Sequence, residues 1–428
     1  MKMVLFEDDS AYNFDPITLT RGTFDIRHGA YTFSERARFA MKVKPESVQF
    51  LARDYIAAHI RDGHKGVANE PDRIDEDATF INGLLVMTQG LAGQIAKAKP
   101  GTVGICGERI AFAKFGESPS VEVARILMNA PGKDATEQIL SMSLEKVSVD
   151  VSSLISNYWE IIETNRDQLG ADLRAFRGRR SRISAKVLGK PSMVTTGKDC
   201  EVGPDVVLDV RKGPIHVGDG ATIHPFTWVE GPAYIGPGTI IHPNSVIREG
   251  SNIGQVCRVG GEVEESVLLG YSNKPHSGFL GHAYVGEWVN LGAMFTNSDL
   301  KNTYGTIKVT IRGKRVDSGT RKLGGMIGDH VKASIGSLLY TGKKVGVCSQ
   351  IHGAVDEDVP SFTFYGKNAG FPTWEILPDP VIKTARTVMG RRGVEMTAAD
   401  EQLVRHVFAI TQSERDALNP GKGPFKFG

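Results

Sequence analysis

The chain has 428 residues, more than one hydrophobic core usually holds, and therefore predicts two or three domains. Its formal net charge is only +2, from 51 Lys and Arg against 49 Asp and Glu, so the composition does not indicate nucleic acid or a membrane surface as a partner. The four cysteines lie far apart and form no Cys-x-x-Cys pair, which argues against a zinc knuckle and a disulfide framework.

Residues 1–180 predict an α/β domain. Apolar segments at residues 3–8 and 79–87 are expected strands, and the segments at 52–66 and 90–98 have the apolar spacing of helices. Strands that alternate with helices are typical of an α/β layer fold. The N-terminal sequence MKMVLFEDDSAYNF turns acidic and has no apolar stretch long enough for a signal peptide or a membrane span. We therefore expect a soluble, cytoplasmic protein.

Residues 181–359 predict a second domain with an internal hexapeptide repeat. Eight successive repeats carry a branched aliphatic residue at the same position: Val217, Ile223, Val229, Ile235, Ile241, Ile247, Ile253 and Val259. Neither the apolar spacing of a helix nor the alternation of an ordinary strand explains this period. A left-handed parallel β-helix does, because each repeat supplies one strand and one turn, and the aliphatic residues stack inside the coils. Such prisms commonly assemble as trimers, so we expect a homotrimer.

Glycines recur within this region at Gly218, Gly236 and Gly254, once in every third hexapeptide. This spacing predicts one corner of the prism, where we expect unusual backbone angles that glycine tolerates. After Val259 the rhythm is lost, and position 265 is a glutamate. The sequence NKPHSGFLGHAYVGEWVNLGA, residues 273–293, follows this break.

Two further segments depart from the repeat. Residues 308–319, KVTIRGKRVDSG, alternate about a glycine and predict a hairpin arm that leaves the prism. Residues 360–428 form a tail, in which MTAADEQLVRHVFAITQSERDAL predicts an amphipathic helix that begins with a capping box of Thr397 and Asp400. We expect this helical tail to cap the solenoid.

Residues 274–293 resemble the acetyltransferase domain of the bifunctional N-acetylglucosamine-1-phosphate uridyltransferase/glucosamine-1-phosphate acetyltransferase family. The sequence FLGHAYVGEWVNLGA followed by NSDLKNTYG is similar to a divergent, GlmU-like group of sugar nucleotidyltransferases. Near the N-terminus, DPITLTRGTFDIRHGAYTFSERARF resembles that group's Pro-Leu-Thr-Leu-Thr-Arg-Pro opening. The resemblance implies a transferase that N-acetylates an amino-sugar 1-phosphate from acetyl-CoA, coupled to a divergent sugar-1-phosphate nucleotidyltransferase for nucleotide-sugar synthesis.

The resemblance also implies roles for individual residues. His276 falls on the catalytic general base, and Asn290 falls on an asparagine that contacts the amino sugar. The other matched positions are the sugar-phosphate ligands Arg248 and Lys322 and the small coenzyme A pocket residues Ala293 and Ser337. Histidine suits this chemistry, because acyl transfer from a thioester needs an uncharged nucleophile and a base near neutral pKa to take its proton.

The match has departures, and each residue has a purely structural interpretation. Phe279 stands where the family has a tyrosine, and the family's phosphate-binding lysine is replaced near Glu264 or Glu265. The family's run Asn-Tyr-Asp-Gly is NSDL in this chain. His276 alone would be a turn histidine, and Asn290 would be an inward ladder rung. Arg248 and Lys322 would then lie on solvated faces.

The N-terminal half departs from a nucleotidyltransferase at its first loop. Such an enzyme normally has a glycine-rich loop after the first strand, whose amides hold phosphates. This chain has FEDDSAYNFD, which repels phosphate unless Asp8 or Asp9 holds Mg²⁺. The candidate nucleotide ligands are then Thr20, Arg21, Arg27 and Arg36. Two interpretations stay open: a working nucleotidyltransferase, or a domain that only binds or scaffolds.

Two other classes of function compete with the transferase. A γ-class carbonic anhydrase is also a left-handed β-helix and needs three histidines that converge on a metal from neighbouring subunits. His224 and His242 are three hexapeptides apart and precede prolines, while His276 and His282 flank the break in the repeat. The matching His-Pro corners are more simply turn residues. The third class is a trimeric β-helix scaffold with an inactive N-terminal domain.

Overall fold

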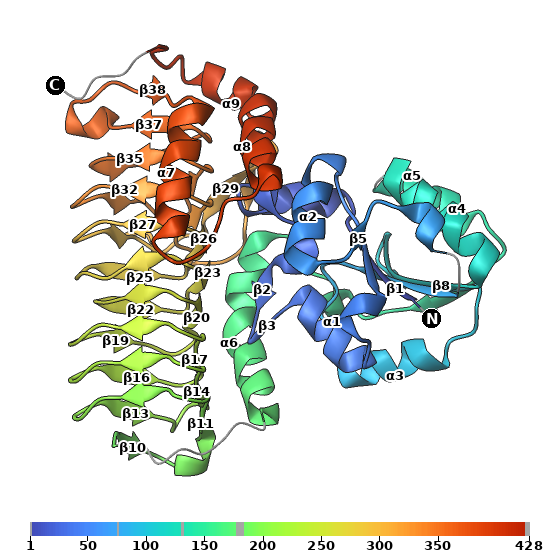
Figure 1. Ribbon diagram of the computed structural model, residues 1–428, viewed down its shortest axis with the longest axis horizontal. Coiled ribbons are helices and arrows are strands. Elements are labelled where there is room, and N and C mark those ends of the chain that lie inside the picture. Colours follow the sequence, from blue (N-terminus) through green and yellow to red (C-terminus); the bar gives the residue numbers. More distant parts are fainter. Residues whose placement is uncertain (1, 75–76, 130–131, 177–183, 424–428) are drawn as a thin grey trace. The chain divides into compact units, whose positions relative to one another are not determined.

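The computed structural model describes residues 2–74, 77–129, 132–176 and 184–423 (Figure 1). The chain divides into two compact units. Unit 1 consists of Met1–Arg27, Tyr31–Glu160 and Ala398–Leu403, and unit 2 consists of His28–Ala30, Ile161–Thr397 and Val404–Gly428. The boundary that the sequence predicts at residues 180–181 lies outside the described residues.

Unit 1 contains a seven-stranded sheet in the order β5-β4-β1-β6-β8-β7-β9. The strands are β1 (Lys2–Phe6), β4 (Val48–Leu51), β5 (Val67–Ala68), β6 (Ala78–Asn82), β7 (Thr102–Cys106), β8 (Arg109–Phe115) and β9 (Glu145–Ser148). Strand β1 pairs in parallel with both β4 and β6, and its side chains from Met3 to Phe6 are all buried. A central strand of this kind is covered on both faces, which explains why its sequence is a continuous apolar run.

Helices and short turns complete unit 1. The helices are α1 (Phe33–Met41), α2 (Ala57–His64), α3 (Gln89–Lys97), α4 (Glu117–Asn129) and α5 (Lys133–Leu140). Helix α1 begins with a capping box, in which Thr32 and Glu35 satisfy each other's backbone amides. Between β1 and α1 lie the 3-10 turns η1 (Asp9–Phe14), η2 (Ile17–Thr20) and η3 (Thr23–Asp25) and the short strands β2 (Arg27–His28) and β3 (Tyr31–Thr32). The α/β fold is as predicted.

Unit 2 is a parallel β-helix. Its strands follow one another from β10 to β38 in Figure 1, and the strands of successive coils pair to form three long sheets. Sheet A contains β10 (Lys186–Leu188), β13 (Val207–Asp209), β16 (Trp228–Glu230), β19 (Val246–Ile247), β22 (Glu262–Glu264) and β25 (Phe279–Gly281). Sheet B contains β11 (Val194–Thr196), β14 (Ile215–Val217), β17 (Ala233–Ile235), β20 (Asn252–Gln255), β23 (Val267–Gly270), β26 (Tyr284–Glu287), β31 (Met326–Ile327) and β34 (Lys344–Val345).

Sheet C is the longest of the three. Its strands are β12 (Glu201–Val202), β15 (Thr222–Ile223), β18 (Ile240–Ile241), β21 (Arg258–Val259), β24 (Asn273–Lys274), β27 (Asn290–Leu291), β32 (Lys332–Ala333), β35 (Gln350–Ile351), β37 (Thr363–Tyr365) and β38 (Trp374–Glu375). A further three-stranded sheet contains β28 (Thr296–Asn297), β33 (Leu338–Leu339) and β36 (Ala354–Val355). The stacked parallel strands and the hexapeptide repeat are those of the expected left-handed β-helix.

The repeated aliphatic residues fill the interior of unit 2. Ile223 pairs with Ile241 and Val217 with Ile235 in successive coils, and all eight repeat positions are buried. Their stacking removes a continuous column of branched side chains from water, which is the main stabilising term for such a fold.

The glycine column lies in successive coils, but the predicted reason for it is wrong. Gly218, Gly236 and Gly254 are not among the residues with positive φ. Instead, a Cβ on Gly236 would lie 2.5 Å from the carbonyl carbon of Gly254, and a Cβ on Gly254 would lie 1.7 Å from the oxygen of Leu269. Close approach of the next coil, and not backbone angle, therefore requires glycine here.

The loss of rhythm after Val259 reflects a change of coil length. Ile240 pairs with Arg258, which is three full hexapeptides further along the chain. Arg258 in turn pairs with Asn273 and Asn273 with Asn290, so the next two coils are both shorter than three hexapeptides. The β-helix thus continues through residues 273–293 without leaving the prism. The arm is the antiparallel hairpin of β29 (Lys308–Ile311) and β30 (Lys314–Asp317), as predicted.

The tail of unit 2 follows the last coils. The helices after the last coils are α7 (Pro378–Gly390), α8 (Ala398–Ile410) and α9 (Gln412–Ala417), while α6 (Tyr158–Ala175) precedes the β-helix. The first residues of α6 and of α8 are assigned to unit 1. Arg415 of α9 is fully buried and donates from Nε to Glu375 of β38 at 2.8 Å. In the described part of the chain, no helix is long and apolar enough to span a membrane.

Candidate active site

His276 lies on an exposed turn between β24 and β25, where the chain passes from sheet C to sheet A. Gly278 makes this turn with a φ of 128°, and a Cβ there would lie 2.0 Å from the oxygen of Phe295. Only glycine fits that position. The sequence PHSG therefore forces a turn that leaves the imidazole at the surface.

The next coils stack directly on this turn. Met294 donates its backbone N–H to Ser277 at 2.9 Å, and Gly336 donates to Ala293 at 2.8 Å. Asn290, the first residue of β27, is exposed and pairs with Asn273, three residues before His276. The structure thus brings His276, Asn290 and Ala293 to one corner on consecutive coils.

Ser337 does not join this surface. Its side chain is buried, and its hydroxyl donates to the carbonyls of Ser334 at 3.0 Å and Ile351 at 3.3 Å. Its hydroxyl therefore bonds to the backbone of its own coil and of the next one. A role for this side chain in lining an external coenzyme A pocket does not fit its position.

Arg248 and Lys322 lie together, although they are far apart in the sequence. Both contact one carboxylate: Arg248 Nη1 lies 3.2 Å from Glu264 Oε2, and Lys322 Nζ lies 3.5 Å from Glu264 Oε1. Arg248 also pairs with Glu262 at 3.3 Å. The structure therefore gathers two cations on sheet A, as a phosphate site requires, but it also places a carboxylate between them.

His282 is a buried charged residue at the end of β25 that the sequence did not single out for this site. Its Nδ1 lies 2.7 Å from Asp299 and its Nε2 lies 3.4 Å from Glu265, which also pairs with Arg166 at 3.2 Å. Burial alone would lower the pKa of His282, but the hydrogen bonds and charges of Asp299 and Glu265 outweigh it and raise the pKa to about 9. At neutral pH His282 is therefore an imidazolium, and it lies beside the group formed by Arg248, Lys322 and Glu264.

The stacked histidines belong to no metal-ligand group among the described residues of the single chain. The rings of His224 and His242 stack with centroids 6.2 Å apart, as expected for matching corners. Within residues 2–423, apart from the undescribed gaps, no group of three or more His, Cys, Asp or Glu side chains is arranged to hold a metal ion. The carbonic anhydrase hypothesis therefore has no support among the described residues.

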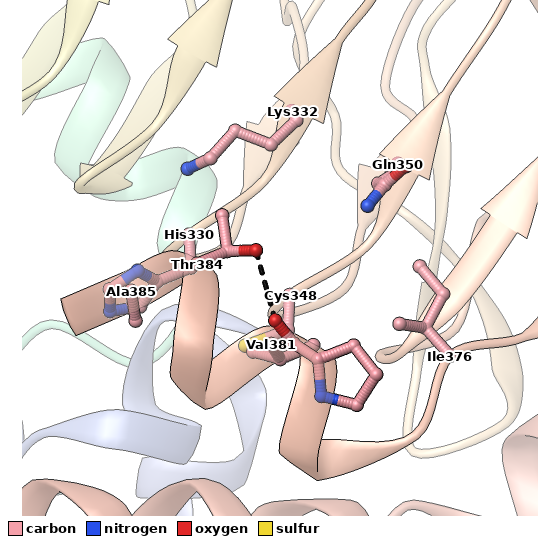
Figure 2. Close-up of a pocket in the computed structure, with 9 residues that line it drawn as sticks. His330, Lys332, Cys348, Gln350, Ile376, Val381, Thr384 and Ala385 are labelled. Carbon is pink, nitrogen blue, oxygen red and sulfur yellow. Dashed lines mark hydrogen bonds between the residues drawn. The ribbon is translucent and has the colours of Figure 1, made fainter. Parts of the chain in front are cut away.

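A small pocket lies elsewhere, between sheet C and α7 (Figure 2). It encloses about 60 Å³ and is lined by residues that include His330, Lys332, Cys348, Gln350 and Thr384. Ligand pockets usually enclose roughly 300–1,000 Å³, so this one is too small for a sugar phosphate. None of the site residues predicted from sequence lines it.

The acidic loop of unit 1 is neutralised by arginines. Arg53 donates to both oxygens of Glu7 at 3.1 Å, and Arg109 donates to both oxygens of Asp8 at 2.8 and 3.2 Å. Asn82 also donates to Asp8 at 2.8 Å. Both Asp8 oxygens therefore accept hydrogen bonds, and two of the loop's carboxylates, Glu7 and Asp8, are paired with arginines.

The other predicted ligands of unit 1 differ in exposure. Asp9 is exposed and Arg27 is half-buried, whereas the side chains of Thr20, Arg21 and Arg36 are buried. The structure therefore does not present these five side chains as one open surface.

The sequences of both units match family models. Residues 3–181 match the family model described as sugar nucleotidyl transferase, and residues 214–249 match the model of the bacterial transferase hexapeptide with six repeats. The chain therefore carries a sugar nucleotidyltransferase domain followed by hexapeptide repeats.

Several curated proteins are similar to parts of the chain. The chain is 37% identical over 158 residues to the bifunctional sugar-1-phosphate nucleotidylyltransferase/acetyltransferase of Sulfurisphaera tokodaii. This match covers 36% of this chain and 39% of that protein. It is 35% identical over 108 residues to the bifunctional protein GlmU of Methanocaldococcus jannaschii, covering 25% and 26%. It is 30% identical over 203 residues to that of Methanococcus aeolicus, covering 46% and 44%. The matches span less than half of each relative.

Proposed function

We propose that unit 2 transfers an acetyl group from acetyl-CoA to an amino-sugar 1-phosphate, with His276 as the general base. We propose further that unit 1 is the coupled sugar-1-phosphate nucleotidyltransferase, so that the two halves serve nucleotide-sugar synthesis. One observation carries the proposal for unit 2: His276 and Asn290 are exposed and Ala293 is half-buried at the same corner of two consecutive coils. The name of the Sulfurisphaera tokodaii relative, which gives both activities, supports it.

The corner offers the groups that acyl transfer needs. His276 takes the proton of the attacking amine as the N–C bond to the acetyl carbon forms, and the coenzyme A thiolate leaves. The carbonyl oxygen becomes negative in the tetrahedral intermediate and needs a donor. The amides of Gly292 and Met294 already donate to Ala333 and Ser277. We therefore assign the oxyanion contact to the N–H of Ala293.

The sugar phosphate is assigned to Arg248 and Lys322 on the adjoining sheet face. Binding there exchanges their contacts with Glu264 for contacts with phosphate oxygens, which are stronger charge-assisted hydrogen bonds. A neutral acceptor has no charge with which to displace Glu264 from these two cations. This exchange favours acceptors that carry a phosphate dianion.

A homotrimer fits the apolar surface near the same corner. Met294, Ile335, Leu338 and Tyr340 are exposed large apolar residues on the coils that follow His276. Contiguous exposed apolar residues on a rigid prism commonly mark a protein–protein contact. We therefore propose that a second copy of the chain covers them.

The test uses the full chain with acetyl-CoA and a panel of amino-sugar 1-phosphates, and it measures free thiol release. Release that depends on the amine and on the 1-phosphate supports the proposal, whereas no release with any amino sugar contradicts it. Pyrophosphate release from UTP or dTTP with sugar 1-phosphates tests unit 1 separately. A chain that releases thiol but no pyrophosphate keeps only the acetyltransferase half of the proposal.

A further inference from the structure

Lys274 occupies an interior position of the β-helix. It lies on β24 beside Val259 of β21, in the column that the aliphatic residues of the repeat occupy. Its side chain is only 1% exposed. A charged side chain in such an interior is costly unless every proton of the ammonium finds an acceptor.

Three backbone carbonyls supply those acceptors. Lys274 Nζ donates to the oxygens of Gly260 at 2.8 Å, Gly278 at 2.8 Å and His276 at 3.2 Å. An ammonium has three protons, so its hydrogen-bonding capacity is filled. Two of the acceptors belong to the exposed turn that carries the His276 side chain.

The surrounding chain is shaped to leave room for this ammonium. Gly261 has a φ of 70°, and a Cβ on it would lie 2.9 Å from Lys274 Nζ, 2.9 Å from the His276 oxygen and 2.8 Å from the Gly278 oxygen. Gly278 itself tolerates no side chain. The carbonyl cage therefore depends on glycines on both sides of it.

We propose that Lys274 is a positioning residue: its buried ammonium holds the backbone of the His276 turn from inside the prism and so fixes the imidazole at the corner. The inference rests on the proposed function of His276, because the turn has a catalytic consequence only if that imidazole acts as the base. Lys274 itself touches no substrate. Hydrogen bonds from an ammonium in a low-dielectric interior are strong, so they restrain the turn.

The titration of Lys274 is consistent with this geometry. Burial lowers the pKa of the ammonium to about 8, against the opposing charge of Glu262. A neutral amine has only two N–H groups, so one of the three carbonyls loses its donor as pH rises through this range. The turn is therefore held most firmly below that pH.

The first experiment measures amide hydrogen exchange of the turn, residues 275–283, in the full chain. Lys274→Met keeps the apolar stem and removes the ammonium, and Lys332→Met is the matched control. Lys332 is half-buried and also donates to a carbonyl, that of Trp288 at 2.6 Å, but it does not bond to the His276 turn. We expect faster exchange of the turn in Lys274→Met and wild-type exchange of the same peptide in Lys332→Met.

The second experiment asks whether an ammonium alone restores the turn. Lys274→Ala leaves the carbonyl cage without its donor, and ethylammonium chloride supplies one, while tetramethylammonium chloride has no N–H and controls for ionic strength. We expect kcat for acetyl transfer to fall by about 100-fold with little change in KM, as small misplacements of a catalytic group do. Ethylammonium should restore both kcat and slow exchange of the turn, and tetramethylammonium should restore neither.

The outcomes separate the two proposals. Wild-type exchange of the turn in Lys274→Met, or equal effects of the two salts on Lys274→Ala, overturns the role of Lys274. Faster exchange with restoration by ethylammonium supports that role, even if His276→Ala retains acetyl transfer and the proposed function fails. If Lys274→Ala does not fold, two comparisons of the wild type with Lys274→Met still decide: the exchange of the turn, and the change of that exchange between pH 7 and 9, which only the wild-type ammonium can add to.

Discussion

Replacing Glu264 by glutamine should tighten the binding of sugar phosphates. Glu264 contacts both Arg248 and Lys322, at 3.2 and 3.5 Å, and these two cations are 42% and 49% exposed. Ion pairs with this exposure contribute about 0–1 kcal/mol each. Breaking both pairs therefore costs phosphate binding at most about 2 kcal/mol, and the substitution removes that cost. A change of one or two kcal/mol corresponds to a factor of about 5–30 in an equilibrium constant.

The assay is calorimetric titration of the full chain with an amino-sugar 1-phosphate at low ionic strength. We expect Glu264→Gln to lower Kd by up to about 30-fold, and the gain should shrink as salt screens the site. Glu262→Gln is the matched control, because Glu262 contacts Arg248 alone at 3.3 Å and should give a smaller gain. An unchanged or weaker Kd in Glu264→Gln would show that Arg248 and Lys322 do not bind the phosphate.

Two further predictions concern stability. The folded pKa of His282 is raised to about 9, so its contribution is fully present below the ordinary histidine pKa and is lost as pH rises through about 9. The wild type should therefore lose about 3 kcal/mol more unfolding free energy than His282→Gln between pH 6.5 and 10 in urea titrations, and parallel curves would refute this. Arg415→Met should destabilise the protein by about 3–5 kcal/mol, because it leaves Glu375 buried without its partner. Arg405→Met, which breaks an exposed pair with Asp379, should cost no more than about 1 kcal/mol, and equal melting shifts for the two variants would contradict the argument.

The sequence was sufficient where the physics is local and periodic. The spacing of Val217 to Val259 predicted the β-helix, because aliphatic residues at this fixed interval fit neither a helix nor an alternating strand. Alternation about Gly313 predicted the hairpin of β29 and β30.

Features that depend on register across coils were not predictable. The two shortened coils after Val259 turn Lys274 inward. Counting hexapeptides does not predict whether Lys274 faces inward or outward. The contact of Lys322 with Glu264 joins residues 58 positions apart, and the hairpin arm lies between them. Nothing local in the acidic loop indicates that Arg109, far along the chain, neutralises Asp8.

The central claim is that His276 is the base for acetyl transfer, and the steady-state rate of His276→Gln tests it most directly. The residue is exposed, so the substitution should leave the melting temperature and the oligomeric state unchanged. General bases contribute about 100- to 10,000-fold, and we expect kcat for thiol release from acetyl-CoA to fall by at least about 100-fold. A folded His276→Gln protein whose kcat stays within about twofold of the wild type would contradict the account.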